Sequence, residues 1–149
     1  MKKILLLLIF ICSFGFADVG GFNNLKWGAS QKEVKEYLIK TYNLHETSMY
    51  EFADYTQVEF ENIEFSNIDL KEICFYFNKD GKFFKWTGES YTIRGDKKNL
   101  IENLKKKYDL TKGDSSKDNF FRKYTKTELI NVYFHPDMIE FAITSIDYL

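Results

Sequence analysis

Few side chains in this sequence combine a reactive type with a spacing that would bring them to one site. A metal site needs several converging donors, and His45 and His135 each have only one acid within two residues. Because neither spacing is a known ligand pattern, we interpret both as surface histidines beside loops. The turn at 78–81 lacks the distant acid that a calcium loop requires. We therefore predict no metal site.

Cys74 is the one thiol that a processed chain would keep. It lies between Ile73 and Phe75 in a strand-like run, without the adjacent positive charge that activates a thiolate. We interpret it as a buried structural cysteine. Among the serines, neither Ser30 nor Ser115 completes the glycine-flanked elbow of common hydrolases.

Carboxylates are plentiful but do not single out a catalytic pair. Alternating acids such as Glu59 and Glu61 usually mark the solvent face of a strand, and Glu72 and Glu140 invite the same interpretation. Neither a glycine-rich phosphate loop nor a dinucleotide fingerprint is present in the sequence. We predict no catalytic residue, no cofactor-binding residue and no cofactor.

Aromatic side chains are the remaining candidates for a binding surface. They make up 18% of the chain, which exceeds what one inner face of a sheet needs. Exposed aromatic clusters on a sheet make good contacts with partners, and the alternative is that the rings cover the core. Our candidates for partner contact are Trp86, Tyr91, Phe120 and Phe121.

The N-terminus has the features of a signal peptide. Two lysines precede an unbroken apolar run at 4–11, and Gly15 and Ala17 place small residues where signal peptidase cleaves. The run is shorter than the roughly 18 to 20 apolar residues of a membrane span. We predict a signal peptide at 1–17 and no membrane span after its removal. The alternatives are an uncleaved anchor and lipidation at Cys12, which follows a large residue instead of a small one.

Residues 18–149 have the length of one ordinary domain. Without the two signal lysines, 21 − 2 = 19 basic side chains face 22 acidic ones, a net charge of −3. This mixed charge argues against nucleic-acid binding, which needs a concentrated basic surface. Loss of Cys12 leaves one cysteine, so no internal disulfide can form.

Two amphipathic helices organise the mature chain. The first begins after Ser30, because Ser30 and Glu33 match a capping box, and apolar residues recur at helical spacing from Val34. The second begins at Asp96 and ends near Tyr108, with lysines close to its C-terminus. At an offset of 66, residues 34–44 and 100–110 match at five positions. We interpret this as a tandem duplication, with halves at about 22–92 and 93–149.

Each helix is followed by alternating segments typical of strands. The clearest hairpin turns at 78–81, because Asp-Gly tolerates the backbone angles of a tight turn. Its second strand carries Phe84 and Trp86, and Pro136 separates the last two strands. The pattern predicts an α+β domain: a mainly antiparallel sheet of about six strands with two helices on one face.

Three motifs carry a family resemblance, located at 27–34, 75–82 and 107–110. They read WGASQKEV, FYFNKDGK and KYDL, which are a capped first helix, a strand leading into a hairpin, and the end of the second helix. In this layout the chain resembles the beta-lactamase-inhibitor-like and SmpA/OmlA-like group of small exported bacterial proteins. The resemblance implies helix-plus-strand units that support protein contacts.

These observations favour an exported, non-enzymatic domain that binds another envelope or extracellular protein through a sheet face. We expect it in the periplasm if the source has an outer membrane, and secreted otherwise. Two other hypotheses stay open: a carrier of a small apolar ligand held between helices and sheet, and an unfamiliar exported hydrolase that uses its acids or Cys74.

Overall fold

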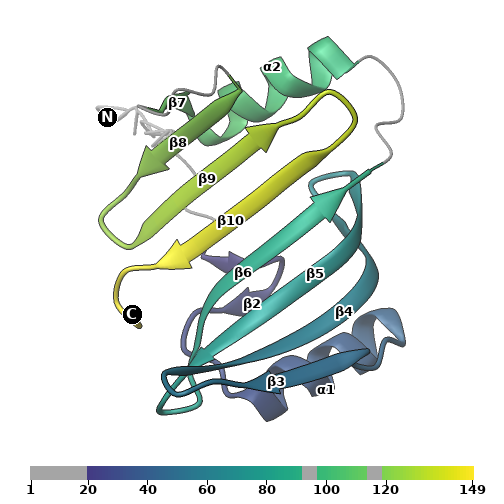
Figure 1. The fold of residues 1–149 in the computed structure, drawn as a ribbon, viewed down its shortest axis with the longest axis vertical. Coiled ribbons are helices and arrows are strands. Elements are labelled where there is room, and N and C mark those ends of the chain that lie inside the picture. The colour runs from purple at the N-terminus through teal and green to yellow at the C-terminus, as the bar shows by residue number, and fades with distance from the viewer. Residues whose placement is uncertain (1–19, 92–96, 114–118) are drawn as a thin grey trace, which may run out of the picture.

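The computed structural model describes residues 20–91, 97–113 and 119–149 (Figure 1). In chain order the described elements are β1 (Gly21–Phe22), β2 (Leu25–Lys26), α1 (Gln31–Tyr42), β3 (Ser48–Glu51), β4 (Tyr55–Phe65), β5 (Ile68–Asn78), β6 (Phe83–Ser90), α2 (Lys97–Tyr108), β7 (Thr111–Lys112), β8 (Phe120–Tyr124), β9 (Glu128–Phe134) and β10 (Ile139–Ser145). The predicted signal peptide at 1–17 and the predicted helix start at Asp96 lie outside the described residues.

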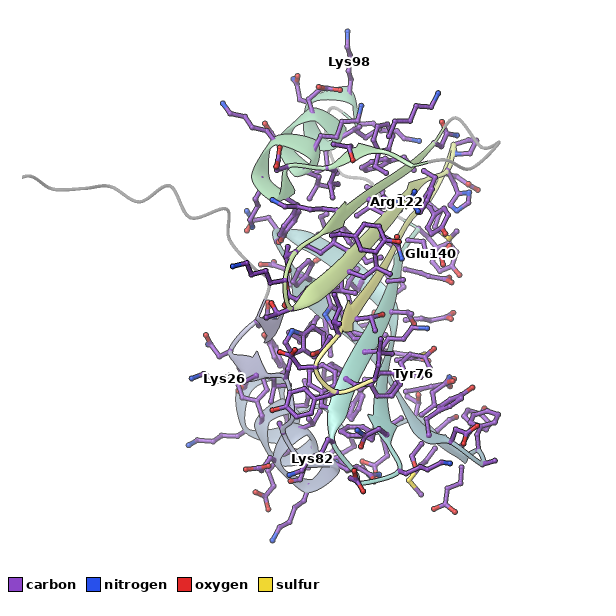
Figure 2. The ribbon with its side chains drawn as sticks, turned by 90° about the vertical axis from the view of Figure 1, so that its left-hand side faces the viewer. Lys26, Tyr76, Lys82, Lys98, Arg122 and Glu140 are labelled. Carbon is purple, nitrogen blue, oxygen red and sulfur yellow. The ribbon has the colours of Figure 1, made fainter. Side chains whose placement is uncertain are left out.

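The strands form an eight-stranded antiparallel sheet in the order β3-β4-β5-β6-β10-β9-β8-β7, and β1 and β2 form a separate ribbon. The expected sheet of about six strands with two helices on one face is therefore wrong. The edge strands β3 and β7 escaped prediction because they have only four and two residues, too few to show alternation. The covering layer also differs, because the β1–β2 ribbon lies between α1 and α2 (Figure 2).

The same order of elements occurs twice, a helix followed by four antiparallel strands. The last strands of the two halves, β6 and β10, pair at the centre of the sheet, so each half extends outward from this junction. Figure 1 places α1 by the β3 end and α2 by the β7 end. A repeated order of elements is no test of whether the two halves arose by duplication, so the tandem duplication stays a prediction.

Helix α1 begins as the sequence predicts, with a capping box. The Ser30 hydroxyl accepts a bond from the Glu33 amide at 3.3 Å, and the Glu33 carboxylate accepts one from the Ser30 amide at 2.7 Å. The Ser30 hydroxyl also donates to the Glu33 carboxylate at 2.7 Å, and this bond, followed by the one from the Ser30 amide, lowers the pKa of Glu33. The helix ends at Asn43 in the left-handed conformation and buries Val34 and Leu38.

The hairpin between β5 and β6 turns at 78–81, as predicted, with Gly81 at a φ of 70°. Its pairing shifts by one residue beyond the turn, because Phe77 lies opposite Phe83 whereas Tyr76 lies opposite Lys85. This bulge buries Phe83 in place of Phe84. Our expectation that Phe84 continues the run of Trp86 is therefore wrong.

The ribbon covers the centre of the sheet. Phe22 lies edge-on to Trp86 with ring centroids 5.0 Å apart, and the Trp86 indole donates a hydrogen bond to the Gly21 carbonyl at 3.0 Å. The ribbon is also anchored to β9, since the buried Glu128 carboxylate accepts a bond from the Trp27 indole at 2.5 Å. Burying Trp86 therefore depends on two strands that have only two residues each.

Candidate functional site

The candidate site is the sheet surface opposite the helices and the ribbon, which we call the open face. Along β10, every second residue from Ile139 to Ser145 is buried and the residues between them are partly exposed. Figure 2 shows Tyr76, Glu140 and Arg122 on the side of the sheet away from both helices. None of the described elements forms a second layer over this face (Figures 1 and 2).

Four glutamates lie in direct cross-strand register at the centre of the open face. Glu61 on β4 is opposite Glu72 on β5. Glu72 is opposite Glu89 on β6, and Glu89 is opposite Glu140 on β10. Because neighbouring strands are about 4.8 Å apart, the four residues form one line across the sheet. We call them the glutamate row.

Little within the described residues neutralises this row. Like charges directly opposite one another destabilise a sheet. The described ion pair of the row joins the His135 Nε2 and Glu140 Oε2 atoms, 3.6 Å apart, and is charged only when the histidine is protonated. Within the same described ranges, neither lysine nor arginine forms an ion pair with the row. The row is therefore a concentration of negative charge.

The negative charge of the row affects the pKa of the neighbouring Tyr91. Its hydroxyl donates a hydrogen bond to the Glu89 carboxylate. This bond, desolvation and the charges of Glu89, Glu72 and Glu140 raise the pKa of Tyr91 to about 12. The ring is 49% exposed, so this predicted partner-contact residue lies beside the row and is open to solvent.

An aromatic ladder flanks the row on the first half of the sheet. The ring centroids of Phe52 and Tyr55 are 4.6 Å apart, those of Tyr55 and Tyr76 are 5.7 Å apart, and Phe84 follows at 6.5 Å from Tyr76. The Lys85 ammonium lies 4.8 Å from the centroid of the Tyr76 ring. The ladder already binds one cation in this way, which is typical of electron-rich rings.

A second aromatic group continues the line of the row onto β9 and β8. Tyr133 is opposite Glu140, and Phe120 is opposite Tyr133. The two rings stack with centroids 4.6 Å apart, and the Arg122 guanidinium lies 6.0 Å from the Phe120 ring. The line of carboxylates thus ends next to the stacked rings of Tyr133 and Phe120.

A polar pocket of about 230 Å³ opens at the other end of the row, between β4 and β5. Its lining includes Glu59, Glu61, Glu72 and Cys74. Desolvation, followed by the charge of Glu59, raises the pKa of the Cys74 thiol. Because the thiol is held in its protonated form, the environment of Cys74 opposes a role as a nucleophile. We expected Cys74 to be buried, and the structure shows it half-buried.

The other predicted contact residues lie in different surroundings. Trp86 is fully buried beneath the ribbon, so its predicted contact with a partner is wrong. Phe120 is only 7% exposed, because it stacks on Tyr133. Phe121 points to the other face, where its ring lies 5.6 Å from Phe134. Of the four candidates, only Tyr91 offers a largely exposed ring.

Only part of the glutamate row could be predicted from the sequence. Alternation at Glu59 and Glu61 did indicate a solvent face, and Glu72 and Glu140 drew the same interpretation. Alternation alone, however, cannot say which residues of separate strands lie opposite one another. The row comes from the register of four strands, and Glu140 comes from the other half of the chain.

The described donors do not assemble a metal centre. Across residues 20–91, 97–113 and 119–149, no group of three or more histidine, cysteine, aspartate or glutamate side chains could hold an ion. His45 is exposed, and the neighbouring Glu46 carboxylate pairs with the Lys35 ammonium at 2.7 Å.

No family model, curated protein or solved structure matches this chain. The resemblance to the beta-lactamase-inhibitor-like and SmpA/OmlA-like group therefore stays a prediction. Neither described helix has the length and apolar character needed to cross a membrane.

Proposed function

We propose that this chain is a binding module that captures a basic segment of another protein on its open face. The observation that carries the proposal is the register of Glu61, Glu72, Glu89 and Glu140 on four adjacent strands. A surface of this charge favours lysine and arginine side chains and steers basic partners toward it.

The dimensions of the row favour a polypeptide over a small cation. Three strand spacings of about 4.8 Å give a line of roughly 14 Å, long enough for several basic side chains of one segment. The flanking rings add a second kind of contact, because arginine and lysine stack on aromatic faces. Phe120 and Tyr133 at one end, and the aromatic ladder on the first half, supply such faces.

The unfavourable register also supports a binding role. Opposed like charges typically destabilise a sheet by about 0.2 to 1 kcal/mol per pair, and this row contains three such pairs. Residues that oppose stability in this way are expected at functional sites, where a partner supplies the missing interaction.

We place this binding outside the cytoplasm, on the evidence of the sequence at 1–17. The proposed partner is therefore an envelope or extracellular protein with an exposed basic segment.

The proposal is tested with a lysine-rich synthetic peptide titrated against the purified protein by fluorescence anisotropy. The variant Glu72→Gln/Glu89→Gln removes two charges from the row, and we expect at least about tenfold weaker binding. We also expect binding to weaken as salt is added, because exposed charges are screened.

The matched control is Glu36→Gln/Glu102→Gln, which removes two charges from the exposed surfaces of α1 and α2. It changes the net charge equally, so a specific site predicts nearly unchanged binding. Equal losses in the two double variants would show that only net charge matters, and failure of the unmodified protein to bind would reject the proposal.

A further inference from the structure

The β3 edge of the sheet, residues 48–52, is rich in exposed apolar side chains. Met49 is 48% exposed, Tyr50 is 47% exposed and Phe52 is 50% exposed. Exposed apolar residues on an edge strand provide a template for pairing with another strand. This observation is independent of the glutamate row.

The hydrogen-bond pattern identifies which peptide groups of β3 point outward. The Phe52 amide donates to the Tyr55 carbonyl at 2.9 Å, which makes this a hydrogen-bonded pair. Because such pairs alternate in an antiparallel ladder, Tyr50 and Ser48 also bond inward to β4. The peptide groups of Met49 and Glu51 therefore face away from the sheet.

The opposite edge of the sheet is protected. Strand β7 has only two residues, Thr111 and Lys112, and both are exposed. A very short strand carrying a lysine discourages edge pairing. The contrast indicates that the β3 edge is the end of the sheet suited to strand addition.

We infer that the β3 edge pairs with the β3 edge of a second copy of this chain. In an antiparallel pair centred on Tyr50, Met49 of each copy lies opposite Glu51 of the other copy. This register bonds every outward peptide group of both strands and places no glutamate opposite another. A pair centred on Met49 uses fewer of these groups, and one centred on Glu51 opposes two like charges.

The pairing places the two Tyr50 side chains side by side and joins two sheets into one. Because the added strand pair is short compared with an ordinary protein interface, the dimer dissociates on dilution. The two open faces then lie on one continuous surface, so a partner with two basic segments gains affinity from both.

The first test is sedimentation velocity across a wide range of protein concentration. Met49→Pro removes an outward amide that β4 does not use, so the fold tolerates it. We expect self-association to weaken by about tenfold or more, since the symmetric dimer loses two bonds. Met49→Ala is the control: it shortens the same side chain but keeps the amide. An unmodified protein that stays monomeric at every concentration would overturn the inference.

The second test fixes the register by disulfide trapping in a Cys74→Ser background. Residues at position 50 of the two copies lie directly opposite, about 4.5 Å apart at Cα, so Tyr50→Cys forms an intermolecular disulfide. Residues at position 48 lie roughly 14 Å apart in this register, so Ser48→Cys does not. Equal trapping of both variants, or of neither, would contradict the pairing.

Discussion

The two halves of the sheet follow the same order of elements but differ in the length of their strands. Strands β4 and β5 have 11 residues each, whereas their counterparts β8 and β9 have five and seven. The shorter strands of the second half still form half of the eight-stranded sheet, and they have their own helix, α2. The added length lies beyond Glu72, toward the β4–β5 turn, where the ring centroids of Phe65 and Tyr108 on α2 are 6.3 Å apart. A common scaffold is thus extended on one side toward α2, whereas the glutamate row lies at a level that strands of both halves reach.

The halves meet at the β6–β10 pair, so the first prediction tests this junction. Trp86 is fully buried on β6 and lies 4.7 Å from Phe65 between ring centroids. We expect Trp86→Ala to lower the free energy of unfolding by about 4 kcal/mol, through lost burial and the cavity left behind. Chemical denaturation measures this loss.

Phe84→Ala on the opposite face of the same strand is the control, with an expected loss of about 1 kcal/mol. If both variants lost the same stability, the ribbon would not form the cover that the structure describes.

The second prediction compares the tyrosines that end the two helices. The buried Tyr108 hydroxyl on α2 lies 2.5 Å from the Ser66 hydroxyl and ties the second half to the β4–β5 turn. Tyr42 on α1 is more exposed, and its hydroxyl accepts a bond from Asn23 at 2.7 Å. We expect Tyr108→Phe to destabilise by about 1.5 kcal/mol and Tyr42→Phe by about 0.5 kcal/mol in thermal unfolding. The reverse order would mean that the Tyr42 bond within the first half stabilises the fold more than the Tyr108 bond between the halves.

The third prediction concerns the cap of α1. Ser30→Ala should destabilise the protein by about 1 kcal/mol at neutral pH, because the helix loses its N-cap bond. The capping bonds lower the pKa of Glu33, so their contribution is present above the unfolded-state pKa. It is lost as the pH falls through the lower folded-state value. Urea titrations at several pH values should therefore show the difference between variant and parent shrinking in acid; a constant difference would argue against the linkage.

The fourth and smallest prediction tests the glutamate row without a ligand. Glu89→Gln removes one charge between two like neighbours, so we expect the protein to gain about 0.5 kcal/mol of stability. Glu102→Gln on α2 loses a carboxylate that pairs with the Lys105 ammonium at 3.1 Å, so it should bring no gain. Differential scanning calorimetry distinguishes the two, and a destabilised Glu89→Gln protein would remove the argument from charge repulsion.

Local sequence signals were enough for the parts of the fold that depend on neighbours in the chain. The capping box at Ser30 and the turn at 78–81 are examples, since each is decided within four residues. The ribbon was missed because β1 and β2 are too short to have a period. The burial of Trp86 was missed for the same reason, since the ribbon is what covers it.

The candidate site was predictable only in outline. A solvent-facing sheet surface with acids and aromatic rings follows from alternation along β4 and β5. The row itself depends on register between strands from both halves, and the bulge beside Phe77 shows how one inserted residue changes such a register. Tyr91 follows the last residue of β6, where alternation gives no guide to its neighbours.

The most direct test is to follow the backbone amide resonances of the protein by NMR while the lysine-rich peptide is added. We predict that the largest shifts occur at the amides of Glu72, Glu89 and Glu140, and at those of the flanking residues Tyr76 and Tyr133. Shifts confined to the outer surfaces of α1 and α2, or no shifts at saturating peptide, would contradict it.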